Sequence, residues 1–161
     1  MEAEIREAQT GEAEALTLLA QRAKASWGYP VAWLEEWAPA LAFEPDYIAG
    51  NTVYVASTTD EILGVIALEE HEEGGEIGHL WVDPEHQGRG VGSALVACAV
   101  QYARDVGWPS LRIESDPFAE PFYQSMGAKR IGDVRAPVAG TDRTLPLLRL
   151  DVFDEGDPPA S

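Results

Sequence analysis

Three glycines at alternate positions, Gly88, Gly90 and Gly92, separate an apolar stretch that ends at Val82 from a long apolar-patterned segment that begins at Val91. Glycine has no Cβ, so it adopts positive φ at little cost and lets another molecule approach the backbone. The first N–H groups of a helix have no partner inside it, and the helix dipole favours negative charge there. The order strand, glycine turn and helix therefore predicts a phosphate-binding loop.

The spacing of this loop excludes two common phosphate-binding motifs. A P-loop needs a Lys-Ser/Thr pair after its second glycine, and no such pair follows here. A dinucleotide-binding G-x-G-x-x-G motif would need a glycine at the position of Ser93. The residues instead give Gln-x-x-Gly-x-Gly at Gln87, Gly90 and Gly92. This pattern resembles the acetyl-coenzyme A pyrophosphate loop of the GNAT superfamily of N-acetyltransferases.

A second stretch strengthens the resemblance. Residues 116–127 are similar to the family signature Asn-x-x-Ala-x-x-Phe-Tyr followed by a glycine, with Asp116, Ala119 and Tyr123 at signature positions. The interval between the two signatures fits one helix and one strand. Asp116 departs from the pattern because an ionised Asp only accepts hydrogen bonds, whereas Asn also donates them. Asp116 either contacts the coenzyme in an altered way or caps a helix that starts near Pro117.

The resemblance implies acetyl-coenzyme A as co-substrate. Its pyrophosphate would rest on the loop amides, and backbone groups of Trp81 and Val82 would pair with the pantetheine arm as a strand would. The residues expected at the coenzyme are Trp81, Val82, Gln87, Gly88, Arg89, Gly90, Val91, Gly92, Ser93, Asp116 and Ala119.

Two residues are candidates for proton transfer. Only a neutral amine attacks a thioester, and an alkylamine with a pKa of about 10.4 is protonated at pH 7. The family often has a glutamate that acts as general base four residues before the Leu-x-Val strand end, and Glu76 occupies this position. Glu76 either acts as the base, directly or through water, or merely continues the acidic run of residues 69–73. At the position of Tyr123 the family has a tyrosine that protonates the leaving thiolate. Without the resemblance, Phe122 and Tyr123 would be interpreted as a packing pair.

Aromatic side chains are dense between residues 27 and 37. Trp27, Tyr29 and Trp33, together with Trp37, either pack against the core or line an acceptor pocket. The first helical pair of the family borders the acceptor site, so these residues are substrate-binding candidates. The acceptor implied is a primary amine on a small molecule or a peptide.

Charge and metal-ligating residues narrow the partners. Eleven basic and 28 acidic side chains give a net charge of −17, and no basic stripe is present, so no nucleic-acid partner is expected. The acidic surface either keeps the protein soluble or attracts cationic amines. The three histidines lack metal-ligand spacing, so no metal is expected, and His79 is expected to be packed. The single Cys98 excludes an internal disulfide and is expected to be an inert core thiol.

Length and hydropathy predict one domain over residues 1–153 and a disordered tail over 154–161. No apolar run could span a membrane and no signal-peptide pattern is present, so we expect a cytoplasmic protein, with a homodimer left open.

Strands are expected at 4–8, 53–56, 62–68, 77–82, 111–115, 129–134 and 145–150, with Pro146 at a strand edge. Helices are expected at 10–26, 31–37 (ending before Pro39) and 91–106, with a turn or one helical turn at 45–48.

The resemblance implies an α+β fold, an α/β/α sandwich around a mixed, mostly antiparallel sheet. Its parallel pair, 77–82 and 111–115, would splay apart and admit the pantetheine. The predicted function is acetyl-CoA-dependent N-acetyl transfer to a primary amine by direct attack on the thioester. A non-catalytic coenzyme A-binding sensor or partner module is the alternative. The antiparallel meander before the glycine loop disfavours a Rossmann-type nucleotide protein.

Overall fold

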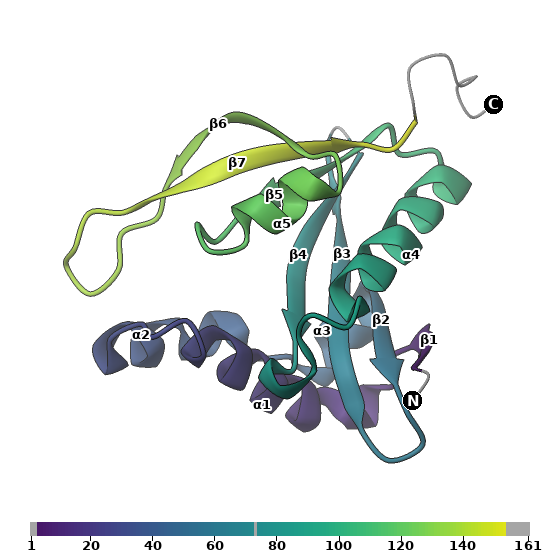
Figure 1. Cartoon of the computed structure of the whole chain (residues 1–161), viewed down its shortest axis with the longest axis horizontal. Coiled ribbons are helices and arrows are strands. Elements are labelled where there is room, and N and C mark those ends of the chain that lie inside the picture. The colour runs from purple at the N-terminus through teal and green to yellow at the C-terminus, as the bar shows by residue number, and fades with distance from the viewer. Residues whose placement is uncertain (1–2, 73, 154–161) are drawn as a thin grey trace. The chain divides into compact units, whose positions relative to one another are not determined.

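The computed structural model describes residues 3–72 and 74–153. They group into two compact units, residues 3–67 with 79–95, and residues 68–72 and 74–78 with 96–153. The single domain over 1–153 stays a prediction, and the predicted tail at 154–161 lies outside the described residues. The elements in chain order (Figure 1) are β1 (Glu4–Glu7), η1 (Thr10–Glu12), α1 (Ala13–Ala25), α2 (Val31–Leu41), α3 (Pro45–Gly50), β2 (Thr52–Ser57), β3 (Ile62–His71), β4 (Gly74–Val82), η2 (Pro84–His86), α4 (Val91–Val106), β5 (Ser110–Glu114), α5 (Glu120–Ser125), β6 (Lys129–Arg135) and β7 (Thr144–Asp151).

The described strands form a seven-stranded sheet in the order β1-β2-β3-β4-β5-β7-β6. β1 pairs antiparallel with β2, and β7 pairs antiparallel with both β5 and β6. β4 and β5 are parallel, and their register covers Gly75↔Leu111 and Glu76↔Arg112. The mixed, mostly antiparallel sheet with one parallel pair confirms the predicted fold class. Since the β4–β5 register ends at Glu76 while β4 continues to Val82, the pairing is short, as expected.

The core of the first unit forms beneath α1. Leu16, Leu19 and Ala20 recur at helical spacing and are almost wholly buried. They pack with Val55 of β2 and Val65 of β3 in one apolar cluster. The predicted amphipathic helix is confirmed, although its first turn is the 3₁₀ turn η1, preceded by Gln9 in extended conformation.

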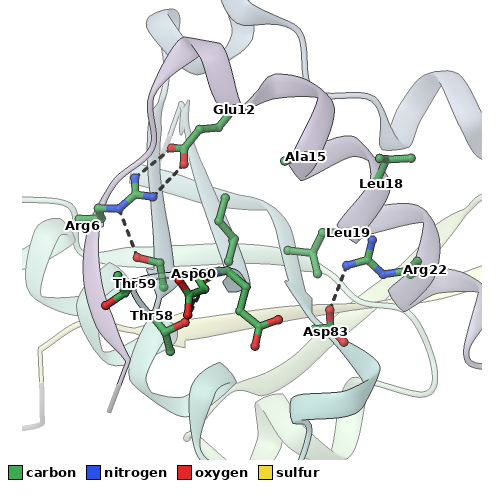
Figure 2. A pocket seen from close by; sticks show the side chains of 13 residues that line it. Arg6, Glu12, Ala15, Leu18, Leu19, Arg22, Thr58, Thr59, Asp60 and Asp83 are labelled. Carbon is green, nitrogen blue, oxygen red and sulfur yellow. Dashed lines mark hydrogen bonds and ion pairs between the residues drawn. The ribbon is translucent and has the colours of Figure 1, made fainter. Parts of the chain in front are cut away.

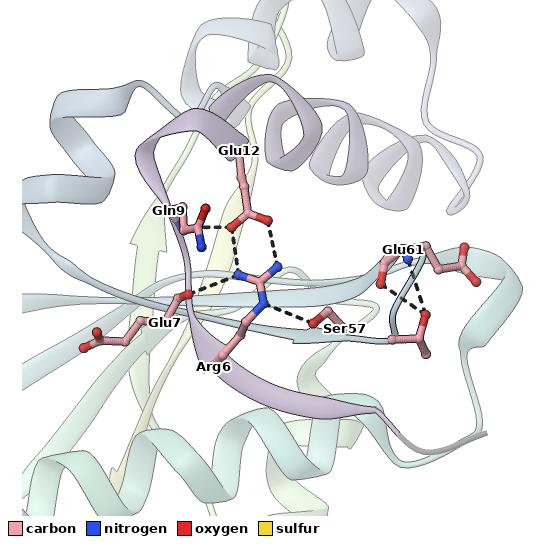
Figure 3. A network of polar contacts seen from close by, with 7 residues as sticks. Arg6, Glu7, Gln9, Glu12, Ser57 and Glu61 are labelled. Atoms are coloured by element: carbon pink, nitrogen blue, oxygen red, sulfur yellow. Dashed lines mark hydrogen bonds and ion pairs between the residues drawn. The ribbon is translucent and has the colours of Figure 1, made fainter.

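A polar network joins β1 to the start of α1 (Figure 3). The Arg6 guanidinium donates to both carboxylate oxygens of Glu12, at 2.9 and 2.8 Å, and through Nε to the Ser57 hydroxyl at 3.2 Å. Glu12 also accepts from the backbone N–H of Gln9 at 2.8 Å. This bidentate pair holds the pKa of Glu12 below its usual value. The network joins β1, η1 and β2 within the first unit.

The two strands β3 and β4 are longer than the predicted strands 62–68 and 77–82, since β3 continues to His71 and β4 begins at Gly74. Gly74 has φ +138°, and a Cβ there would lie 2.7 Å from the Ser110 carbonyl oxygen. A Cβ on Gly75 would lie 2.3 Å from the Trp108 ring. Both glycines therefore belong to a strand that passes very close to Trp108 and Ser110.

Pro39 does not end α2, contrary to prediction: the helix continues to Leu41. Proline removes one backbone donor, and here it does so only in the last turn. Continuation of the helix buries Leu41 and leads into Phe43, which is also buried.

Pro146 lies on β7, which is flanked by β5 and β6 rather than forming a sheet edge. Pro146 is paired with Asp133, and its carbonyl accepts from the Ser115 N–H at 2.9 Å. A register shift between Arg130 and Gly132 locally disturbs the β6–β7 ladder near this proline. The predicted strand is therefore correct, but its expected position at an edge is not.

The buried face of α4 is formed partly by small residues. Leu95, Val96, Ala99 and Ala103 are fully buried, whereas Val106 is exposed. The small alanines on this face allow close packing of the helix. The spacing of the larger apolar residues alone does not indicate that these alanines are buried. Among the described residues, no helix is long and apolar enough to cross a membrane.

Candidate active site

The glycine loop begins where β4 ends, at Asp83. Its carboxylate accepts from the Glu85 N–H at 2.9 Å and so caps the turn η2. Gly88 and Gly90 then take φ of +78° and +81°, and a Cβ at either would meet nothing within 4 Å. Glycine is therefore favoured here by backbone conformation rather than by space. Gly92 and Ser93 lie in the first turn of α4, next to Val91.

A close approach of α4 to the sheet explains a further glycine in this region. A Cβ on Gly64 of β3 would lie 2.9 Å from Val91 Cγ1, 3.0 Å from Leu95 Cδ1 and 3.1 Å from the Trp81 carbonyl oxygen. Gly64 therefore allows the N-terminus of α4 to pack directly against β3 and the end of β4. Sequence reasoning treated Gly64 only as part of an apolar strand and missed this role.

An ion pair ties the loop to α1. Arg22 donates to the Asp83 carboxylate at 2.9 Å (Figure 2). Burial alone would raise the pKa of Asp83, but the Glu85 amide and the Arg22 guanidinium lower it below its usual value. Arg22 was not predicted, because 61 residues separate it from Asp83 and no local pattern connects them.

His86 is buried immediately before Gln87. Its Nε2 lies 3.3 Å from a Glu61 carboxylate oxygen, and its Nδ1 lies 3.8 Å from Asp83. With Arg89 and Gly90, His86 lines a small cavity of about 200 Å³. These contacts fasten the start of the loop to the β2–β3 turn.

A larger cavity of about 480 Å³ lies beside α1, bordered by the Arg6–Glu12 and Arg22–Asp83 ion pairs (Figure 2). None of the residues predicted to bind donor or acceptor or to transfer protons lines it. It is therefore separate from the predicted site.

The aromatic candidates form one cluster around Lys24. The Lys24 ammonium lies 4.1 Å from the centroid of the Trp37 ring, 5.2 Å from that of Tyr29 and 5.7 Å from that of Trp27. Trp33 stacks on Tyr29 at 5.7 Å between ring centroids. Lys24 is 9% exposed, so its charge is embedded among these π faces. The sequence analysis singled out Trp27, Tyr29 and Trp33 but missed the lysine.

Trp81 extends this cluster to β4. Its ring lies 6.1 Å from Trp27 and 5.9 Å from the Lys24 ammonium. Its indole N–H donates to His79 Nδ1 at 2.9 Å, and the His79 ring packs 4.4 Å from Phe43. The prediction of a packed, hydrogen-bonded His79 is confirmed.

Glu76 lies in the second unit, in register with Arg112 of β5. Its Oε1 accepts from Arg112 Nη1 at 3.2 Å, and Arg112 also binds Glu114. Burial raises the pKa of Glu76 above its usual value, opposed by Arg112 and reinforced by Glu114. Glu76 is therefore a partly buried carboxylate paired with Arg112, and its role as general base stays a prediction.

Asp116 shapes the turn that precedes α5. Its Oδ1 accepts from the Phe118 N–H at 2.9 Å, and its carbonyl accepts from the Ala119 N–H at 2.9 Å. The helix α5 begins at Glu120. Asp116 therefore caps the preceding turn, and the alternative of a helix that starts near Pro117 is wrong. Its Oδ2 lies 3.3 Å from Arg143 Nη2, a residue that sequence reasoning missed.

Tyr123 is buried on α5, with its N–H bonded to the Ala119 carbonyl at 3.1 Å. Burial, and then the charge of Asp116, raise the pKa of its phenol. The phenol is therefore fully protonated at neutral pH and able to donate. In the second unit the structure links Asp116, Ala119 and Tyr123 through local hydrogen bonds.

Cys98 is partly buried, and burial raises the pKa of its thiol, which makes it a poor nucleophile. Within residues 3–72 and 74–153, no group of three or more His, Cys, Asp or Glu side chains could hold a metal ion.

Residues 16–128 match the acetyltransferase (GNAT) family. The chain belongs to this family. It is 30% identical to human N-acetyltransferase 8 over 92 residues, which cover 52% of this chain and 40% of that protein. The chain thus matches less than half the length of this curated relative.

The fold is shared with solved structures of the family. A GCN5-related N-acetyltransferase from Rhodopseudomonas palustris has a TM-score of 0.78 at 18% identity, over 94% of this chain and 96% of that one. The PaiA N-acetyltransferase from Thermoplasma acidophilum, solved in complex with coenzyme A, has a TM-score of 0.76 at 19% identity, over 94% and 99% of the two chains. These likenesses confirm the predicted fold.

Proposed function

We propose that this protein transfers an acetyl group from acetyl-CoA to a primary amine by direct attack of the amine on the thioester. The observation that carries the proposal is the loop after β4. Gly88 and Gly90 take left-handed φ immediately before the 16-residue helix α4, in the sequence pattern of the family to which the chain belongs. A relative of the same fold was solved with coenzyme A.

The donor would be bound mainly by backbone groups. The pyrophosphate would accept hydrogen bonds from amides between Gln87 and Ser93, including those of Gly88, Arg89 and Gly90, at the positive end of the α4 dipole. Arg89 would add the positive charge that an anionic coenzyme needs on a chain of net charge −17. Backbone groups of Trp81 and Val82 would pair with the pantetheine amides.

Two side chains would move the protons. Glu76, directly or through water, would take a proton from the acceptor ammonium, and its raised pKa supports that role. The neutral amine would attack the acetyl carbonyl, and the C–S bond would break as the tetrahedral intermediate collapses. Tyr123 would give its phenolic proton to the departing thiolate. The extra proton on the attacking nitrogen would return to the phenolate, directly or through water, which leaves a neutral amide and restores the phenol. The phenol is protonated at neutral pH, as this role requires.

The acceptor would meet the aromatic cluster around Lys24. Because the lysine ammonium lies over the Trp37 and Tyr29 rings, a second ammonium on the acceptor would meet a like charge there. We therefore propose acceptors with one amine on an apolar or aromatic body, in preference to polyamines. The acidic surface then serves solubility rather than substrate attraction.

Thermal melting with acetyl-CoA, coenzyme A, NAD and ATP at matched concentrations tests the donor site. A ligand that binds only the folded state stabilises it by about 2.7 kcal/mol at a hundred times its dissociation constant. We expect a shift with the two coenzyme A species alone. Equal shifts with NAD, or none with coenzyme A, would remove the basis of the proposal. Binding without any thiol release in an amine panel would favour a coenzyme A sensor instead.

A further inference from the structure

Arg143 is a largely buried cation that no sequence motif accounts for. It lies just before β7, and its side chain is 11% exposed. Its Nη2 lies 3.3 Å from Oδ2 of Asp116, whose side chain is 7% exposed. The backbone carbonyl of Arg143 accepts from the Ala136 N–H at 2.7 Å, so the β6–β7 hairpin fixes the position from which the guanidinium extends.

A continuous set of hydrogen bonds leads from this ion pair to Tyr123. Asp116 uses one carboxylate oxygen for Arg143 and the other for the Phe118 N–H. Its carbonyl accepts from Ala119, and the Ala119 carbonyl accepts from Tyr123 at 3.1 Å. The guanidinium therefore stands at one end of a short polar chain and the phenol-bearing residue at the other.

The charge of Asp116 makes Arg143 necessary. Where the family signature has a neutral Asn, this chain has a carboxylate in a buried position. A buried charge without a partner is strongly unfavourable, whereas a neutral amide needs no counter-charge. Asp116 and Arg143 together thus replace one neutral residue by a neutralised pair.

We propose that Arg143 is a positioning residue for acetyl transfer: it neutralises the charge of Asp116, and so fixes the 116–119 turn and the orientation of Tyr123. The proposal rests on the proposed role of Tyr123 as general acid. Arg143 itself is assigned no contact with donor or acceptor.

The same hairpin supplies a matched control. Arg135 pairs with Asp142 at 3.5 Å, but these side chains are 79% and 95% exposed. Arg135→Gln removes the same charge from the same hairpin, but its partner carboxylate is in solvent, so no buried carboxylate loses its arginine. Exposed ion pairs contribute little to stability, so this variant should behave as wild type.

The test measures kcat and the KM for acetyl-CoA, by thiol release, for Arg143→Gln, Asp116→Asn, Asp116→Asn/Arg143→Gln and Arg135→Gln. Loss of one buried partner should lower kcat of Arg143→Gln by about tenfold or more, with the KM changed less. The double variant should recover to within about threefold of wild type, because a neutral amide then occupies the buried position. Arg143→Lys, which keeps the charge, should fall between wild type and Arg143→Gln.

The pH dependence separates positioning by charge from loss of packing. Without the Arg143 charge, protonation of the Asp116 carboxyl removes an uncompensated negative charge. Arg143 faces this carboxyl, whose charge also acts on the Tyr123 phenol. The activity deficit of Arg143→Gln relative to wild type should therefore shrink between about pH 8 and pH 6. A packing defect would leave the ratio constant.

Two results would overturn the inference: Arg143→Gln behaves like Arg135→Gln, or the double variant is as impaired as the product of the two single defects. If Arg143→Gln folds poorly, the activities of the double variant and of Arg143→Lys test the proposal instead. If wild type itself releases no thiol with any amine, the proposed function fails first, before any variant is compared.

Discussion

The two units of this protein bring different kinds of chemistry to the proposed reaction. In the first unit, the loop from Gln87 to Ser93 offers backbone amides whose directions are set by glycine conformation. In the second unit, Glu76 and Tyr123 offer side chains whose proton affinities are set by burial and neighbouring charges. Donor binding should therefore depend on backbone geometry, and turnover on charged side chains.

The two regions also differ in how they offset the net negative charge of the protein. Backbone dipoles and a helix N-terminus attract a pyrophosphate whatever the net charge of the surface. The carboxylates of the second unit instead need specific cations. Arg112 lies between Glu76 and Glu114, and Arg143 neutralises Asp116.

The largest effect should come from Tyr123→Phe, which removes the proposed acid and keeps the ring. We expect kcat to fall about 10² to 10³-fold with little change in affinity for acetyl-CoA. Steady-state kinetics and calorimetric titration measure the two quantities. Tyr102→Phe makes the same change elsewhere in the second unit and should leave kcat unaltered. An unchanged kcat in Tyr123→Phe would exclude the general-acid role.

Glu76→Gln should lower kcat/KM about 10 to 10²-fold at neutral pH. A base must be ionised, so wild-type activity should fall with decreasing pH through a pKa above that of an ordinary glutamate. The Gln variant should lack this limb of the pH profile. Glu70→Gln, on the exposed end of β3, is the matched control. If the limb persists in Glu76→Gln, another group is the base.

Gly90→Ala should weaken acetyl-CoA binding about tenfold, because a left-handed φ costs an L-residue roughly 1–2 kcal/mol. Its kcat at saturating donor should change less, which would sharpen the distinction between backbone binding and side-chain catalysis. Gly11→Ala, at a glycine without positive φ or close neighbours, is the control. Wild-type affinity in Gly90→Ala would show that the loop conformation does not limit donor binding.

The smallest expected effect is the contribution of Asp83, the first residue of the loop, to the stability of the protein. Asp83→Asn should lower the free energy of unfolding at pH 7 by about 1 kcal/mol, through loss of the charged contact with Arg22. The folded-state pKa of Asp83 is lowered, so its ionised form stabilises the fold above the unfolded pKa. That contribution disappears as the pH falls through the folded pKa. Denaturant unfolding of both proteins should therefore converge in acid, whereas Asp142→Asn should match wild type at every pH.

Local patterns were sufficient for much of the fold and for the loop. Strand and helix periodicities located the described elements to within a few residues, and the spacing of Gln87, Gly90 and Gly92 identified the family. The errors arose where distant packing overrides local preference. The Ser110 carbonyl and the Trp108 ring leave no space for a Cβ at Gly74 and Gly75, which lie in a strand. The helix α2 continues past Pro39 to the buried Leu41.

The missed site residues are those with long-range partners. Arg22 contacts Asp83 across 61 positions, Arg112 contacts Glu76 across 36, and Arg143 contacts Asp116 across 27. Each is an arginine beside a buried or half-buried carboxylate, and no local spacing indicates such a pair. Asp116 in place of Asn was the one available signal, since a buried carboxylate requires a cation that must come from elsewhere in the chain.

The most direct test is thiol release from acetyl-CoA, measured with and without a panel of primary amines, together with the mass of the intact protein. Direct attack predicts release only when an amine is present, one acetylated amine for each thiol, and no acetylated protein in the absence of acceptor. Thiol release without amine, accompanied by an acetylated chain, would contradict direct transfer. No release with any amine would contradict the proposed activity itself.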